Sequence, residues 1–79
     1  MNTIEQEWQK LASRIFSPTT PPIQRKEMRR AFYAGAVAVF SMISTAADDD
    51  TDDDSFIAGM QQWEEEFRQF AEAVQAGKA

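Results

Sequence analysis

The sequence predicts an all-α fold in which a short N-terminal helix packs on an antiparallel hairpin of two longer helices. Three observations predict it. Apolar residues recur every three or four positions in three separate segments, and prolines or aspartates separate these segments. No segment alternates Val, Ile or Thr with polar residues, as a strand would. Because 79 residues support only a modest core, we expect a single domain over residues 1–79.

The first predicted helix spans about residues 3–16. One apolar stripe runs along it in steps of four, three and four residues: Ile4, Trp8, Leu11 and Ile15. Asn2 and Glu5 have the spacing of a capping box at its start. The helix is expected to end near Phe16, since the prolines within residues 17–22 cannot continue it.

The second predicted helix spans about residues 21–47. Thr20 is its expected cap, and Pro21 fits the first helical position, where a missing N–H is harmless. A heptad-like seam repeats along this helix in steps of four and three: Met28, Phe32, Gly35, Val39, Met42 and Ala46.

The third predicted helix spans about residues 54–76 and follows an Asp-rich loop at residues 48–54. Asp53 or Asp54 is its expected cap, and Gly77 suits a left-handed turn at its end. Its seam has the same steps as that of the second helix: Phe56, Met60, Trp63, Phe67, Phe70 and Val74. Because the two seams match in length, we expect the two helices to pack as an antiparallel hairpin.

A second apolar stripe lies on the second helix, about 60° to 180° from the seam when successive residues are placed about 100° apart. It consists of Tyr33, Ala36, Val37, Phe40 and Ile43. The first helix covers this stripe in a monomeric bundle, or shares it with another subunit. We expect a homo-oligomer that associates through this central helix, because so small a chain without disulfides or metals gains stability by association.

Composition excludes most catalytic chemistry. The chain has no Cys and no His, which removes disulfides, thiol nucleophiles, zinc fingers, His-ligated metals and the Ser-His-Asp triad. We therefore expect a binding protein that is not an enzyme and that carries no cofactor or metal. The net charge of −5 argues against binding duplex nucleic acid, which needs a broad basic surface.

The sequence favours a cytoplasmic protein without membrane contact. Residues 31–47 carry no charge, but their length lies at the lower edge of what spans a bilayer. They include Tyr33, Ser41, Ser44 and Thr45, and no aromatic belt flanks them. The N-terminus lacks the basic region of a signal peptide.

Four of the eight Lys and Arg residues lie in the first turns of the second helix: Arg25, Lys26, Arg29 and Arg30. The helix dipole disfavours cations there, and like charges four residues apart repel by about 0.2–0.5 kcal/mol per pair. Together with the free N–H groups of a helix start, this basic cluster is the candidate anion site, most simply for phosphate. Tyr33 lies on the same side, where it can stack on a base. The predicted ligand-binding residues are Arg25, Lys26, Arg29, Arg30 and Tyr33.

The alternative interpretation is that carboxylates neutralise the basic cluster as surface ion pairs, which contribute little to stability. The candidate partners are Glu5, Glu7, Glu64, Glu65, Glu66 and Glu72. Phe32 lies on the seam of the hairpin and is expected in that core rather than in a ligand site.

Six of the thirteen acidic residues lie within residues 48–54. This run lacks the central Gly and the final Glu of an EF-hand loop, so we interpret it as a solvated loop that caps the third helix. A cluster of aspartates can also imitate the phosphates of a nucleic acid. A protein-binding inhibitor that acts through this run is therefore the alternative function.

Residues 22–36, which read PIQRKEMRRAFYAGA, resemble a segment of small phage and prophage proteins. The whole architecture resembles helical-hairpin anti-CBASS and anti-Thoeris sponges, and the matching positions are Arg29, Arg30, Phe32 and Gly35. Unlike those proteins, this chain has no Arg-Ala pair after its Gly. The resemblance implies an oligomer that sequesters a cyclic nucleotide immune signal at a basic pocket between subunits, in the cytoplasm of the host cell. An anti-CRISPR-like inhibitor of a host defence protein is the alternative.

Overall fold

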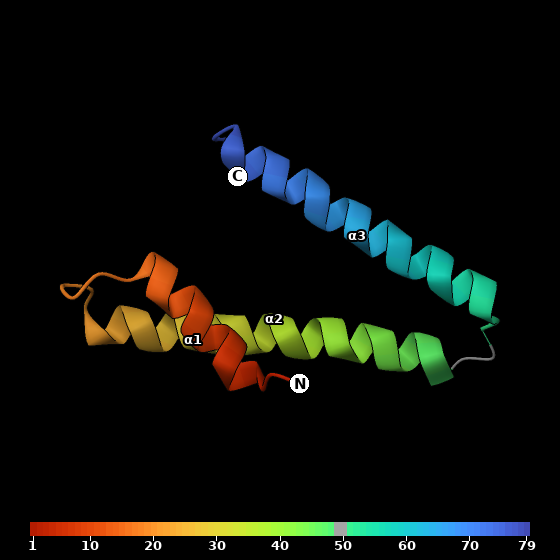
Figure 1. Cartoon of the computed structure of the whole chain (residues 1–79), viewed down its shortest axis with the longest axis horizontal. Coiled ribbons are helices and arrows are strands. Elements are labelled where there is room, and N and C mark those ends of the chain that lie inside the picture. Colours follow the sequence, from red (N-terminus) through yellow and green to blue (C-terminus); the bar gives the residue numbers. More distant parts are fainter. Residues whose placement is uncertain (49–50) are drawn as a thin grey trace. The chain divides into compact units, whose positions relative to one another are not determined.

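The computed structural model describes residues 1–48 and 51–79 and contains three helices: α1 (Ile4–Ile15), α2 (Pro22–Asp48) and α3 (Asp53–Gln75) (Figure 1). No strand occurs among the described residues, so the all-α prediction is confirmed. Each helix begins and ends within one residue of its predicted bounds. The agreement follows from local signals, because apolar periodicity sets the body of a helix and proline or glycine sets its ends.

Two compact units make up the chain: unit 1 (Met1–Met42) and unit 2 (Ile43–Ala79). Unit 1 holds α1 and most of α2, and unit 2 holds the last turn of α2 and all of α3. The packing of α3 on α2 as a hairpin, and the single domain that would result, stay predictions.

The start of α1 is capped by Thr3 and not by the predicted Asn2 and Glu5. The Thr3 hydroxyl accepts a hydrogen bond from Gln6 N (3.0 Å), and Thr3 N donates to Gln6 Oε1 (2.8 Å). The capping box is therefore present one residue later than predicted. Asn2 instead donates to the Glu7 carboxylate at 2.7 Å. A residue of capping type stands at both position 2 and position 3, and the helix takes the one next to Ile4.

The start of α2 also differs by one residue from the prediction. Pro22, and not Pro21, is the first helical residue, and the Pro21 carbonyl accepts hydrogen bonds from Gln24 N (3.1 Å) and Arg25 N (3.2 Å). Thr20 does not cap the helix, because its hydroxyl accepts from Ser17 N (3.0 Å) and so closes the turn before it. With two prolines in succession, the second occupies the position where a missing N–H is harmless.

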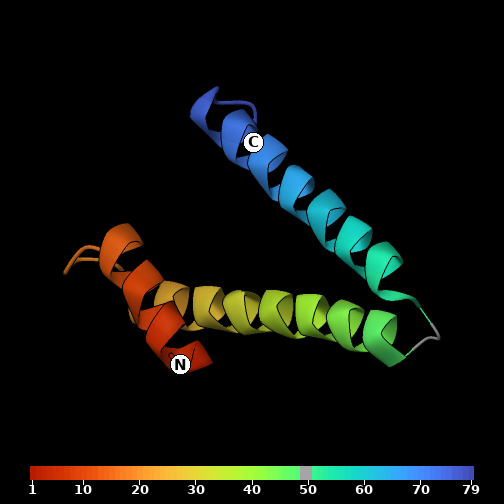
Figure 2. The same ribbon diagram turned by 45° about the vertical axis from the view of Figure 1, so that its right-hand side comes forward.

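Trp8 holds α1 against α2. Its side chain is only 4% exposed, and it is the one buried residue in the described part of the chain. Its ring lies 5.5 Å from the Phe32 ring and 5.8 Å from the Phe16 ring, measured between centroids. Figures 1 and 2 show α1 lying across the N-terminal half of α2, which is where this contact forms.

Phe32 contacts α1, whereas the sequence assigned it to the seam that faces the third helix. Its half-buried ring packs on Trp8. On the helical projection Phe32 lies about 40° from Met28, between the seam and the second stripe. A Trp side chain is large enough to reach a residue at that boundary. The rest of the α1 stripe is less buried, since Ile4 and Ile15 are 51% and 43% exposed.

Large apolar side chains remain exposed along α2, and no residue of this helix is buried. Val37 and Phe40 of the second stripe are 62% and 70% exposed. By length and composition alone α2 could cross a membrane, with a mean hydropathy of 1.3 over its most apolar window. The core helices of soluble proteins meet the same criterion.

In unit 2, Asp52 caps α3 in place of the predicted Asp53 or Asp54. The Asp52 carboxylate accepts a hydrogen bond from Ser55 N at 2.7 Å, and this bond lowers the pKa of Asp52. Asp53 and Asp54 then lie in the first turn, where the helix dipole favours negative charge.

The end of α3 agrees with the prediction at Gly77. Gly77 has φ +73°, a left-handed conformation that glycine adopts without strain. Lys78 N donates to the Ala73 carbonyl (2.8 Å) and Gly77 N to the Val74 carbonyl (3.1 Å). This is the bonding pattern of a Schellman motif, which satisfies carbonyls that the helix end would leave free.

Trp8→Ala is expected to release α1 from α2. Replacing a buried Trp by Ala costs about 3–5 kcal/mol, and a 12-residue helix is too short to persist without packing. Circular dichroism at room temperature should show less helix than in wild type, and the midpoint of thermal unfolding should be lower. Ile4→Ala, on the same helix but half exposed, is the matched control and should cost much less. Equal losses for the two variants would contradict the central role of Trp8.

Candidate functional site

Three of the five predicted ligand-binding residues line one groove of unit 1, which we call the cationic groove. It has a volume of about 320 Å³ and lies where α1 crosses the start of α2. Its lining residues are Trp8, Gln9, Ala12, Phe16, Arg25, Lys26 and Arg29. The groove therefore combines three cations with the edges of two aromatic side chains.

Arg25 has a structural role in addition to its place in the groove. Its Nη2 donates to the Ser17 carbonyl at 2.6 Å and its Nε to the Thr20 carbonyl at 3.4 Å. Its guanidinium also lies 5.1 Å from the centroid of the Phe16 ring. These contacts fix the connection between α1 and α2. They give one reason why a cation stands near a helix start, where the helix dipole disfavours it.

Arg29 and Tyr33 both bind Glu5 of α1. Arg29 Nη2 and the Tyr33 hydroxyl donate to the same carboxylate oxygen, Glu5 Oε2, at 2.8 and 2.7 Å. Gln9 Nε2 donates to the other oxygen, Oε1, at 2.9 Å. The Arg29 guanidinium lies 4.9 Å from the centroid of the Tyr33 ring. We call Glu5, Arg29 and Tyr33 the polar bridge, because it joins α1 to α2.

The polar bridge changes the acidity of its members. Hydrogen bonds from Tyr33, then Arg29, then Gln9 favour the ionised carboxylate and lower the pKa of Glu5 from 4.5 to about 2. The hydrogen bond to Glu5 raises the pKa of the Tyr33 hydroxyl, and the same carboxylate raises the pKa of Arg29. Glu5 and Arg29 therefore both carry full charge at neutral pH.

Arg30 and Tyr33 do not line the cationic groove. Arg30 lies 3.5 Å from the Glu27 carboxylate on the exposed surface of α2, so the structure separates it from the other three cations. Lys26, by contrast, lines the groove and forms no ion pair or hydrogen bond with any described residue.

The start of α2 contributes less to an anion site than the sequence suggested. Pro21 and Pro22 have no N–H, and the N–H groups of Gln24 and Arg25 are bonded to the Pro21 carbonyl. Only the N–H of Ile23 is left in the first turn. An anion site in this region would therefore depend on side chains. The prediction that several free backbone N–H groups contribute to it was wrong.

The ion-pair interpretation holds for part of the basic cluster. Glu5 is one of the predicted partners and pairs with Arg29, whereas Arg30 pairs with Glu27, which is not among them. Of the other candidate partners, Glu7 pairs with Lys10 at 3.1 Å. Within α3, Arg68 binds Glu65 and Glu72.

Several donors of the cationic groove stay free within the described residues. A guanidinium has five N–H donors, and neither Arg25 Nη1 nor Arg29 Nη1 is engaged by those residues. Unit 1 also has six Lys and Arg against three Glu, a net charge of +3, whereas unit 2 has two against ten acids, a net charge of −8. The groove thus presents free cationic donors within a unit whose net charge is positive.

The aromatic walls of the groove were missed at the sequence level. Trp8 was predicted as core, and Phe16 only as the end of a helix. Phe16 is the C-cap residue of α1, and its ring contacts both Trp8 and Arg25. An aromatic residue placed directly before a proline-rich turn is the signal that could have indicated this wall.

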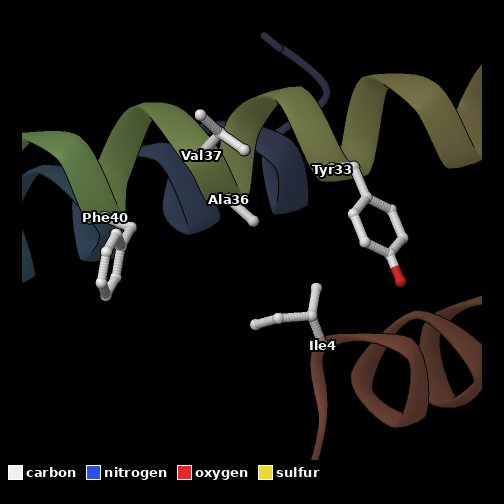
Figure 3. Close-up of a pocket in the computed structure, with 5 residues that line it drawn as sticks. All are labelled: Ile4, Tyr33, Ala36, Val37 and Phe40. Atoms are coloured by element: carbon white, nitrogen blue, oxygen red, sulfur yellow. The ribbon is translucent and has the colours of Figure 1, made fainter.

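An apolar groove of about 280 Å³ lies elsewhere on unit 1 (Figure 3). Its lining residues are Ile4, Tyr33, Ala36, Val37 and Phe40. Figure 3 shows the Tyr33 and Phe40 side chains extending from α2 on the side where Ile4 of α1 lies. Four residues of the predicted second stripe therefore line a surface that α1 covers only at Ile4. Tyr33 belongs both to this groove and to the polar bridge.

The acidic run has a structural role in its described part. Asp52 caps α3, and Asp53 and Asp54 lie in its first turn, which agrees with the interpretation of a capping loop. The predictions for Asp49 and Asp50 lie outside the described residues. Among the residues that the structure describes, no three His, Cys, Asp or Glu side chains are placed to hold a metal ion.

Glu5 is expected to make unit 1 sensitive to acid. A carboxylate with a lower pKa in the folded state stabilises that state above its ordinary pKa of 4.5, and the contribution is lost as the pH falls toward about 2. Near neutral pH, wild type should therefore be more stable than Glu5→Gln. This difference in stability should disappear as the pH falls from 4.5 toward about 2. Urea unfolding, followed by Trp8 emission in a Trp63→Phe background, measures it. Glu7→Gln is the control, because the Glu7 carboxylate bonds only Asn2 and Lys10. The Trp8 emission of this variant should match that of wild type. A pH-independent difference for Glu5→Gln would contradict the polar bridge.

Comparison with protein-family models, with curated proteins and with solved structures finds no match for this chain. The proposals on function consequently rest on the cationic groove, the polar bridge and the apolar groove of unit 1.

Proposed function

We propose that this chain is a small binding protein that sequesters a phosphate-bearing signalling nucleotide, of the cyclic kind, at the cationic groove. One observation carries the proposal: Arg25, Lys26 and Arg29 line the same groove, which also has aromatic walls. Guanidinium groups bind phosphate oxygens through paired N–H donors, and ammonium groups bind them as point charges. Phosphate binding thus suits all three cations.

The aromatic walls favour a nucleotide over inorganic phosphate as the ligand. Phe16 borders the groove at the C-cap of α1 and is half-buried, so part of its surface is open to a base. Base stacking on an aromatic side chain contributes about 1–3 kcal/mol and tolerates different bases. A volume of about 320 Å³ lies at the small end of ligand pockets, which suits one nucleotide unit of such a ligand and not a large cofactor.

Sequestration, and not turnover, is the activity that this composition supports. The sequence has no Cys or His to act as nucleophile or base near neutral pH, and the one carboxylate of the polar bridge is held ionised by its partners. The resemblance to anti-CBASS and anti-Thoeris sponges supports the same proposal: an anti-defence protein, encoded by a phage, that removes a cyclic nucleotide signal in the host cytoplasm.

A second copy of the chain is the proposed occupant of the apolar groove. Val37 and Phe40 are 62% and 70% exposed there, and a monomer rarely leaves such side chains in contiguous patches. The small core, with Trp8 as the one buried residue of the described part, leaves room for association as a further source of stability. Because Tyr33 joins the apolar groove to the polar bridge, a second copy seated there would approach the ligand site.

Calorimetry against a panel of cyclic di- and trinucleotides at low salt tests nucleotide binding. Wild type should release or absorb heat with at least one member, and Lys26→Gln should weaken binding about tenfold, the effect of one charge-assisted hydrogen bond. Lys26 is the suitable variant, because it forms no ion pair or hydrogen bond with any described residue. Lys10→Gln, which removes a cation of α1 outside the groove, should not weaken binding. No heat with any member would refute the proposal.

Light scattering tests association through α2. Wild type should form a dimer or larger oligomer, and Phe40→Glu should dissociate it by placing a charge in the apolar groove. Ser41→Glu, the neighbouring position on α2 and not part of the groove, is the matched control and should remain associated. A wild-type protein that stays monomeric over all concentrations would exclude a site shared between subunits.

The alternative function, an acidic inhibitor of a host defence protein, is favoured by one observation: the net charge of −8 on unit 2. It is tested by capture of a stoichiometric protein partner from host lysate. Asp53→Asn with Asp54→Asn should abolish that capture, because both carboxylates are exposed. The cap residue Asp52 is kept, so that α3 is retained.

A further inference from the structure

The Glu5 carboxylate occupies donors that a phosphate group would use. Arg29 Nη2 and the Tyr33 hydroxyl both donate to Glu5 Oε2, at 2.8 and 2.7 Å. The two donors thus converge on one anionic oxygen, as they would on a phosphate oxygen. Arg29 also lines the cationic groove, so this carboxylate lies at the border of the proposed ligand site.

We propose that Glu5 is a built-in competitor that occupies the Arg29 and Tyr33 donors until a phosphate-bearing ligand displaces it. The inference rests on the proposed function and adds the regulation of the same site. The affinity for the ligand is set by the difference between the binding free energies of the ligand and of Glu5 at these donors. In the free protein the donors are kept paired and oriented, and the basic cluster is partly neutralised.

Displacement of Glu5 requires little rearrangement. The Glu5 and Arg29 side chains are 42% and 51% exposed, so the carboxylate can rotate into water and regain hydration. Glu5 lies in the first turn of α1, and Trp8 one turn later keeps the helix seated. The capping box of Thr3 and Gln6 uses other atoms and stays intact. Release of Glu5 is therefore a side-chain movement and not an unfolding of α1.

The competition is appreciable because Glu5 is tethered. A group held beside its partner acts at an effective concentration on the order of millimolar or more. A weak anion such as chloride cannot displace it, whereas a phosphate-bearing ligand that binds Arg29 and also occupies the cationic groove gains contacts to Lys26 and Arg25, which Glu5 does not contact. Glu5 thus favours ligands that carry enough negative charge to displace it and that also contact Arg25 and Lys26.

The experiment measures the affinity of wild type, Glu5→Gln and Glu7→Gln for inorganic phosphate at constant ionic strength. Trp8 emission in a Trp63→Phe background, together with the midpoint of thermal unfolding, reports binding. Glu5→Gln should bind phosphate about tenfold more tightly than wild type, because the neutral amide competes poorly for Arg29. Glu7→Gln, which removes a carboxylate of α1 that bonds Asn2 and Lys10, should match wild type. Phosphate affinity that is equal in all three proteins would overturn the inference.

A second variant keeps the test decisive if Glu5→Gln releases α1, which a red shift of Trp8 emission would reveal. Gln9→Ala removes the hydrogen bond to Glu5 Oε1 and leaves both bridge contacts to α2. Gln9→Ala should raise phosphate affinity by a smaller factor than Glu5→Gln does. Phosphate binding that is unchanged or weaker would count against the competitor role of Glu5.

The failure of this inference differs from the failure of the proposed function. If a cyclic nucleotide binds wild type and Glu5→Gln equally well, and phosphate binds no more tightly to the variant, Glu5 is no competitor and the nucleotide proposal stands. If no nucleotide binds either protein while phosphate binds Glu5→Gln more tightly, the competitor role stands and the nucleotide proposal fails.

Discussion

The packing of Trp8 on Phe32 and Phe16 is the contact on which the rest of unit 1 depends. Trp8 is the only buried side chain in the described part of the chain, and it fixes where α1 crosses α2. That crossing brings Phe16 beside the cations of the second helix and so creates the cationic groove. It also brings Ile4 over the second stripe of α2 and so defines the apolar groove. Both surfaces are consequences of one aromatic contact.

The basic cluster at the start of α2 has a structural role in addition to the proposed binding role. Arg25 bonds two carbonyls of the connection, and Arg29 bonds Glu5 of α1, so part of the electrostatic cost of placing cations there is offset within the fold. These contacts are exposed, and exposed ion pairs contribute little to stability. An external anion can exchange with an internal ion pair only if that pair is weak, so the exposed bridge between Glu5 and Arg29 is compatible with the proposed ligand.

Helix positions followed from the sequence, whereas side-chain contacts between helices did not. Periodicity and proline gave the bounds to within one residue, because both act locally. The caps were displaced by one residue wherever two capping residues stand side by side, as at Asn2 and Thr3. The contact of Phe32 with Trp8 was not predicted, because Phe32 lies at the boundary of two stripes. The bonds of Arg25 depend on the path of the preceding turn, which no residue pattern encodes.

The distribution of charge restricts the ligand more than the net value of −5 does. Unit 1 has six cations, of which Lys10, Arg29 and Arg30 already pair with carboxylates. A duplex gains affinity with the number of phosphates that a protein neutralises, so three further cations in unit 1 favour a small proposed ligand over a nucleic acid. The proposed ligand, with only a few phosphates, needs no more than Arg25, Lys26 and the Arg29 that displacement of Glu5 would release. Beyond about 8 Å the acids of the chain are screened at physiological salt, so such a ligand responds to the local positive field and not to the net negative charge.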